Sequence, residues 1–93
     1  MSLLDERSIA AELETTPGWE RDGEAIVTTV RLADFAEAMA FVNRVAELAE
    51  EADHHPDITI RWNTVTLSLS THSAGGLTGK DFDLARRING LRG

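Results

Sequence analysis

The sequence predicts a two-layer α+β fold in the order α-β-β-α-β-β-α, with a four-stranded antiparallel sheet covered on one face by helices. Three observations lead to it. The first half has a run of β-branched residues at 27–30, and residues 58–70 alternate apolar and polar side chains with the period of a strand. A long segment between these regions repeats its apolar residues with the period of a helix, and turn signals separate the elements. The chain of 93 residues is expected to form one domain over positions 1–93.

The first elements are a short helix and a hairpin. The helix is expected over about residues 5–14, and Thr16-Pro17-Gly18 ends it. Residues 19–21 and 25–31 then read as two strands. Asp22-Gly23 is expected to be the tight turn between them, because both central positions of such a turn can take positive φ.

A long helix is expected over about residues 34–52. Asp34 and Glu37 have the spacing of an N-cap and its reciprocal acid. Its broad apolar face consists of Phe35, Met39, Val42, Ala46 and Ala49, with Phe41, Val45 and Leu48 beside them. A face this broad fits either a sheet on one side and a partner subunit on the other, or a well-buried helix within a monomer.

The second half predicts another hairpin and a last helix. The long helix must end before Pro56. Ile58, Ile60 and Trp62 alternate with polar residues as one strand, and 64–70 alternate as a second strand whose polar parity extends to His72. A loop over 73–77 leads to the capping signature Thr78-x-x-Asp81 and to a helix of about 12–14 residues.

Composition narrows the classes of function. A net charge of −7 disfavours nucleic-acid binding, and the absence of cysteine excludes disulfides and thiolate chemistry. The amino terminus lacks the pattern of a signal peptide, and no apolar run is long enough to span a membrane. We therefore expect a cytoplasmic protein that contacts neither nucleic acid nor membrane.

The three histidines are the most informative residues, because imidazole exchanges protons near neutral pH. His54 and His55 lie at or just past the end of the long helix, and His72 lies at the end of the last strand, so the fold can bring them together. Four interpretations compete: local capping at a helix end, a zinc site, a serine–histidine hydrolase, and metal-free general acid–base catalysis. Neither H-E-x-x-H nor a nucleophile-elbow pattern is present, which favours acid–base catalysis over zinc or a hydrolase.

Several motifs together resemble the pterin-4a-carbinolamine dehydratases, also called 4a-hydroxytetrahydrobiopterin dehydratases. They are Glu50-x-x-x-His54-His55-Pro56, Trp62-Asn63, Ser70-Thr71-His72, Gly76-Leu77 and Asp81, with further similarity at 18–19, 34–35 and 41–45. The similarity covers about residues 17–90. One departure is Ile58, where animal members carry tryptophan.

The resemblance implies specific site residues. His54, His55 and His72 match the catalytic histidines of the family, and we expect His54 and His72 to be the acid–base pair, with His55 holding the pterin or sharing the acid role. The other matched positions are Asp53, Ser70 and Thr71 in the pterin site, Glu50 and Asp81 as acids that orient imidazoles, and Trp19 as an apolar wall.

The resemblance also implies a reaction. The family removes water from a 4a-hydroxytetrahydropterin left by an aromatic amino-acid hydroxylase, giving a quinonoid dihydropterin, without a metal or bound cofactor. Independently of the resemblance, a chain this short would bury more surface by association, so we expect a homodimer or homotetramer. The alternative function is a non-catalytic dimerisation or assembly partner on the same fold.

Overall fold

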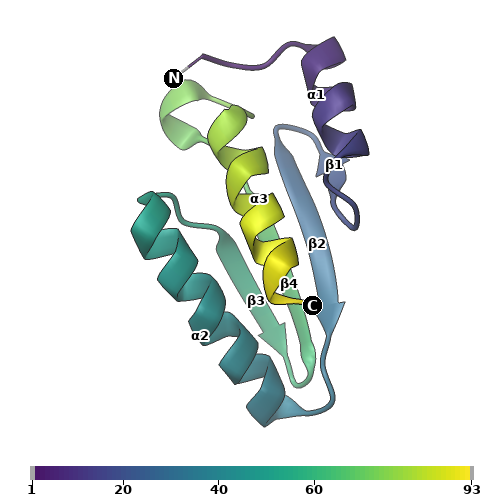
Figure 1. Ribbon diagram of the computed structural model, residues 1–93, viewed down its shortest axis with the longest axis vertical. Helices are drawn as coiled ribbons and strands as arrows, with labels where there is room; N and C mark the ends of the chain where they lie inside the picture. The colour runs from purple at the N-terminus through teal and green to yellow at the C-terminus, as the bar shows by residue number, and fades with distance from the viewer. Residues whose placement is uncertain (1, 93) are drawn as a thin grey trace.

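The computed structural model describes residues 2–92 and has the expected order of elements (Figure 1). The helices are α1 (Glu6–Glu14), α2 (Phe35–Ala52) and α3 (Gly79–Leu91), with a short 3₁₀ turn, η1 (His72–Ala74). The strands are β1 (Glu20–Asp22), β2 (Ala25–Arg31), β3 (Asp57–Arg61) and β4 (Thr64–Leu69). The predicted α+β class and the alternation of helices and hairpins are confirmed.

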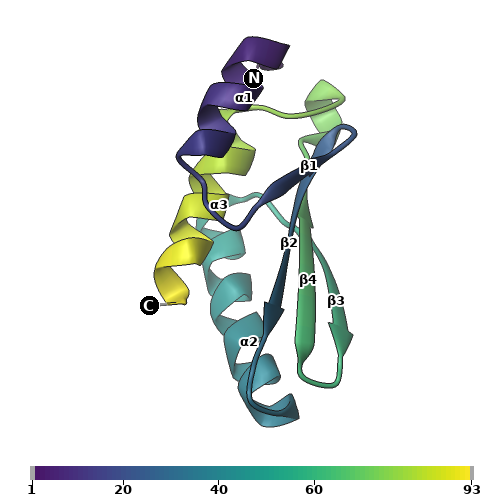
Figure 2. The same ribbon diagram turned by 90° about the vertical axis from the view of Figure 1, so that its right-hand side faces the viewer.

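The strands form one antiparallel sheet in the order β1-β2-β4-β3. Within residues 2–92, the side view shows α1, α2 and α3 on one face of this sheet and none of these three helices on the other (Figure 2). The period-two pattern explains this arrangement, because Ile26, Val65 and Leu67 are fully buried beneath the helices. Thr29, Thr66 and Thr59 pair across three strands on the uncovered face.

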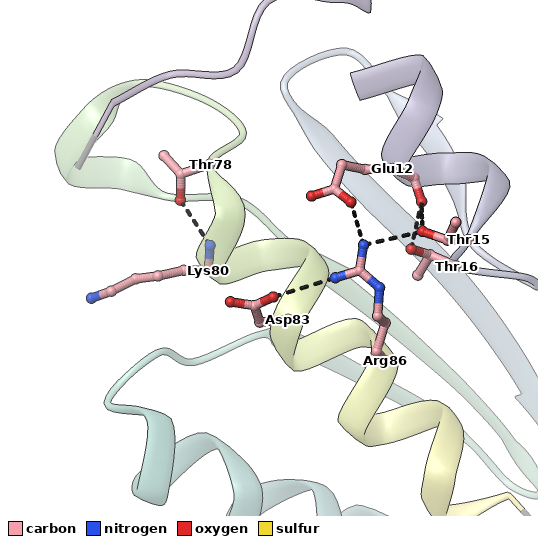
Figure 3. A network of polar contacts seen from close by, with 7 residues as sticks. All are labelled: Glu12, Thr15, Thr16, Thr78, Lys80, Asp83 and Arg86. Carbon is pink, nitrogen blue, oxygen red and sulfur yellow. Dashed lines mark hydrogen bonds and ion pairs between the residues drawn. The ribbon is translucent and has the colours of Figure 1, made fainter. Parts of the chain in front are cut away.

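The helices are fixed by caps and by packing. Asp34 caps α2 by accepting a hydrogen bond from the backbone N–H of Glu37 at 2.9 Å. On α3, Arg86 reaches across to α1, where it contacts Glu12 and donates to the Thr15 hydroxyl at 3.2 Å (Figure 3). This contact joins the first and last helices of the chain.

Two turn predictions need correction. The β1–β2 turn is formed by Gly23-Glu24 and not by Asp22-Gly23, and only Gly23, at φ 62°, has positive φ. A glycine at the first central position suffices for a two-residue hairpin turn. Trp62 does not continue β3: it sits in the β3–β4 turn at φ 52°, and 65% of it is exposed. Turn geometry therefore overrode the alternating pattern there.

The apolar face of α2 is divided between the core and the surface of the chain, which does not match the alternative of a helix fully buried within a monomer. Ala38, Phe41, Val45 and Ala49 are buried against the sheet and α3, whereas 51% of Phe35 is exposed, and Ala46 is exposed too. Part of the predicted stripe thus belongs to the surface of this chain. Periodicity identified the helix but could not tell which flank of a broad apolar face meets the sheet.

Candidate active site

The end of α2 determines where the first two histidines lie. Asp53 adopts the left-handed conformation, at φ 50°, that commonly ends a helix, and the backbone N–H of His54 returns to the carbonyl of Ala49 at 3.1 Å. Pro56 follows and begins the path into β3. The chain reverses within these few residues, so His54 turns inward and His55 outward.

His54 contacts a buried carboxylate. Its Nε2 lies 2.5 Å from Oδ1 of Asp81, and the exposed fractions of the two side chains are 10% and 0%. An ionised carboxylate only accepts hydrogen bonds, so in this pair Nε2 carries the proton. We call His54 and Asp81 the inner pair. Among the residues that the structure describes, Nε2 is the nitrogen of this ring that has a hydrogen-bond partner.

Asp81 is held by more than the histidine. Its second oxygen accepts hydrogen bonds from the Thr71 hydroxyl at 2.8 Å and from the backbone N–H of Thr78 at 3.0 Å. Thr78 is the N-cap of α3, so one carboxylate completes a capping box and also fixes an imidazole. A buried carboxylate requires such partners, and together they fix its position.

His55 forms a similar contact at the surface. Its Nε2 lies 2.5 Å from Oε2 of Glu50, one turn back along α2, but the exposed fractions here are 55% and 77%. We call His55 and Glu50 the outer pair. Both acids expected to orient imidazoles therefore contact one, in very different surroundings.

His72 lies beyond the end of the sheet. The sequence placed it on the polar parity of the last strand, but β4 ends at Leu69 and His72 begins η1. The loop closes through a bridge between Thr71 and Gly76, whose N–H to O distance is 2.9 Å, and through Gly75 at φ 81°. A 3₁₀ turn replaces the strand there, and the His72 ring is exposed beside the other two histidines.

One pocket of about 400 Å³ unites the predicted residues. Its lining consists of Asp53, His54, His55, Ser70, Thr71, His72, Ser73 and Lys80. All three histidines and the predicted Asp53, Ser70 and Thr71 are among them, while Asp81 and Glu50 support the rings from behind. Sequence reasoning missed Lys80, because no motif in the sequence around it marks it as a site residue.

Trp19 is the predicted site residue that the structure places elsewhere. It is 4% exposed in the core, and its Nε1 donates to Oδ1 of Asn89 at 3.0 Å. It is absent from the lining of the histidine pocket. Trp19 joins the segment before β1 to the far half of α3, so its apolar surface serves packing.

Choosing the candidate site by cavity volume alone would have pointed to another region of the molecule. A hollow of about 580 Å³ lies at Arg61, Trp62 and Thr64, at the opposite end of the sheet, with no carboxylate, histidine or cysteine in its lining. The histidine pocket is smaller but gathers proton-transfer groups in one place, which is the better indicator of chemistry.

Two further properties bear on the kind of site. Across residues 2–92, no three histidine or carboxylate side chains are grouped as metal ligands would be. In the same part of the chain, no helix is both long and apolar enough to cross a bilayer.

The fold and the pocket together define a class of small α+β proteins whose helix end and sheet end present histidines to one cavity. Comparison with protein families makes the assignment specific. The model of the pterin 4 alpha carbinolamine dehydratases matches residues 2–91, and the chain belongs to this family.

Curated relatives support the assignment to this family. A protein of Thermomicrobium roseum is 61% identical over 88 residues, covering 95% of both chains, and one of Chloroflexus aurantiacus is 54% identical over 93 residues and the full length of both. Each carries the provisional name pterin-4-alpha-carbinolamine dehydratase.

Solved structures extend the comparison. A transcriptional coactivator/pterin dehydratase from Brucella melitensis superposes with a TM-score of 0.94 at 34% identity, over 99% of this chain and all of that one. A pterin dehydratase-like protein described as a RuBisCO assembly factor of the alpha-carboxysome superposes with a TM-score of 0.69 at 24% identity, over 82% of this chain and 90% of that one. At that identity the likeness concerns the fold alone.

Proposed function

We propose that this protein catalyses the dehydration of 4a-hydroxytetrahydropterin to quinonoid dihydropterin and water, by histidine acid–base catalysis in pterin recycling. The observation that carries the proposal is the convergence of His54, His55 and His72 on one pocket, with one imidazole held by a buried carboxylate. Family membership supplies the substrate class. The cytoplasmic location expected from the sequence is part of the proposal.

The reaction needs two proton transfers. The C4a–oxygen bond breaks as the leaving hydroxyl takes a proton and departs as water, while the neighbouring ring nitrogen loses its proton and its electron pair forms the new C=N bond. Positioned acids and bases typically each contribute about 10²- to 10⁴-fold. His54 and His72 are assigned as the acid–base pair, and His55 as the residue that holds the ring or shares the acid role.

The inner pair suits this assignment. Because Asp81 binds Nε2–H, the ring is held in one tautomer, and an imidazolium formed during the reaction would be stabilised by the same carboxylate. Asp53 and the segment Ser70-Thr71 would then hold the amide-like edge of the pterin.

The test is an absorbance assay with 4a-hydroxytetrahydropterin generated by an aromatic amino-acid hydroxylase. The protein is expected to accelerate formation of the quinonoid product well above the spontaneous rate. Equal rates with and without protein would overturn the proposal. In the same assay, near-wild-type turnover by His72→Ala would remove the assignment of His72.

A second candidate function is non-catalytic dimerisation or assembly. It is favoured by the exposed apolar flank of α2, where 51% of Phe35 is accessible. The same flank would serve the homodimer or homotetramer expected for an enzyme. Comparing the sedimentation of the wild type with that of Phe35→Asp tests whether the flank mediates association. A non-catalytic assembly role predicts that a variant with all three histidines replaced sediments as the wild type does.

A further inference from the structure

Two buried threonines connect the inner pair to the start of α3. The Thr71 hydroxyl donates to Oδ2 of Asp81 at 2.8 Å and lies 2.9 Å from the Thr78 hydroxyl. The Thr78 hydroxyl in turn accepts from the backbone N–H of Lys80 at 3.3 Å (Figure 3). Both threonines and Asp81 are at most 5% exposed, so these contacts are shielded from water. We call the chain from the Lys80 N–H through Thr78 and Thr71 to Asp81 the hydroxyl relay.

The direction of every proton in the hydroxyl relay follows from the carboxylate at its end. An ionised carboxylate only accepts, so the single proton of the Thr71 hydroxyl is used on Asp81. Thr71 can then only accept from Thr78, and Thr78 gives its own proton to Thr71. All the protons therefore point toward Asp81, and neither hydroxyl can turn without leaving a buried partner unpaired.

The hydroxyl relay restricts Asp81 to one arrangement. Its Oδ2 is occupied by the Thr71 hydroxyl and the Thr78 N–H, which leaves Oδ1 for Nε2 of His54. Without the Thr71 hydroxyl, the carboxylate could rotate and share its two oxygens differently among the remaining donors. The relay therefore fixes the inner imidazole through the carboxylate, and hydrogen bonds that form a chain inside a protein also strengthen one another.

The backbone of Thr71 supports the second histidine of the assigned acid–base pair. Its carbonyl accepts from the N–H groups of Ala74 and Gly75, both at 3.0 Å, and these bonds close η1, the turn that begins at His72. Thr71 thus holds the turn of His72 with its backbone and the carboxylate behind His54 with its side chain. One residue sets the position of both imidazoles.

We infer that Thr71 is a positioning residue for the proposed dehydration, and that Thr78 acts with it by orienting its hydroxyl. This inference rests on the proposed function, because it gives the hydroxyl relay the task of fixing His54 relative to His72. Neither hydroxyl has a proton left for a substrate, so their effect on the reaction passes through Asp81. Positioning matters because a displacement of about 1 Å can lower the rate about 10²-fold.

The experiment compares two isosteric variants that each remove one buried hydroxyl. Thr71→Val interrupts the relay, and we expect kcat to fall about tenfold with KM within about twofold of the wild type. Thr28→Val is the matched control, because the Thr28 hydroxyl is also buried and donates to the carbonyl of Gly18 at 2.6 Å, but lies on β2 outside the histidine pocket. The control should lose stability and keep the wild-type kcat. Thr71→Ser, which restores the hydroxyl, should recover most of the lost kcat.

A second measurement reports on the imidazole directly and needs no substrate. Long-range proton–nitrogen NMR spectra distinguish the two tautomers of a neutral histidine ring, and the tautomer depends on the hydrogen bonds that the ring makes. The wild type should show His54 with its proton on Nε2 alone. Thr71→Val should show a mixture of tautomers, and Thr28→Val should match the wild type.

The outcomes separate this inference from the proposed function. A Thr71→Val variant with wild-type kcat or an unchanged His54 tautomer, or an equal loss of kcat in Thr28→Val, overturns the positioning role and leaves dehydration standing. A wild type that does not accelerate dehydration overturns both. Should Thr71→Val fail to fold, the wild type decides: the inference predicts a slowly exchanging Thr71 hydroxyl proton, and one that exchanges freely with water overturns it.

Discussion

The inner and outer pairs are chemically alike and physically different. In each, a histidine Nε2 lies 2.5 Å from a carboxylate oxygen, and the two histidines are neighbours in sequence. The inner carboxylate is fully buried and bound by three partners, whereas the outer one is 77% exposed. A histidine–carboxylate contact alone therefore does not preorganise an imidazole. Burial of the carboxylate and its place in the capping box of α3 do so.

The largest effect is expected from the inner imidazole. His54→Ala should lower kcat/KM by about 10²- to 10⁴-fold, because it removes a proton-transfer group from the reacting centre. His55→Ala should lower it by much less, since the outer ring has a supporting role. Stopped-flow kinetics on both folded variants tests the contrast, and equal losses would show that the two rings work as equals.

The next effect concerns the carboxylate behind the inner ring. Asp81→Asn keeps the shape of the side chain but supplies an amide that can also donate, which disturbs the tautomer of His54 and the cap of α3. We expect a lower kcat with little change in KM, and a loss of about 1–3 kcal/mol in the free energy of unfolding. Urea denaturation measures the free energy of unfolding, and steady-state kinetics measures kcat and KM. Unchanged values would contradict the role of Asp81 in both the cap of α3 and the inner pair.

Glu50→Gln is the matched change in the outer pair, and its effect should be small. Exposed ion pairs contribute about 0–1 kcal/mol, because water screens them and the side chains lose freedom when they pair. We expect the free energy of unfolding to change by no more than about 1 kcal/mol and kcat/KM to change by less than about fivefold. A loss as large as that of Asp81→Asn would contradict the comparison.

The surface ion pair of Arg21 and Glu6, neither of which lines the pocket, gives the smallest effect and a pH control. The hydrogen bond from Arg21 lowers the pKa of Glu6 below its usual 4.5. A carboxyl with a lowered folded pKa stabilises above its unfolded pKa, and this stabilisation disappears as pH falls through the folded value. Thermal melts of the wild type and Glu6→Gln should differ slightly at neutral pH and converge in strong acid. A difference in melting temperature that grows in acid would contradict the lowered pKa of Glu6.

The sequence predicted those parts of the fold that depend on local patterns. The period of α2, the alternation of β4, and the Thr78–Asp81 capping box all depend on nearby residues, and each formed as expected. Trp62 was misread, because the period of a pattern does not say where a turn begins. The two alternatives for the broad face of α2 stayed open, because the period does not say which flank meets the sheet.

The candidate site was predicted only in part, because local patterns identify some of its residues and not others. The histidines could be named because they are rare and match the family motif. Lys80 escaped notice because nothing in its local pattern marks it, and Trp19 was misplaced because its contact with Asn89 spans 70 positions in sequence. The position of η1 also depends on a bridge that no periodicity encodes.

The most direct test is the single-turnover rate of 4a-hydroxytetrahydropterin dehydration, measured for the wild type and for a folded variant in which all three histidines are glutamine. Our account predicts strong acceleration by the wild type and a return to the spontaneous rate in the variant. A variant that retains the wild-type rate, or a wild type that gives no acceleration, would contradict it.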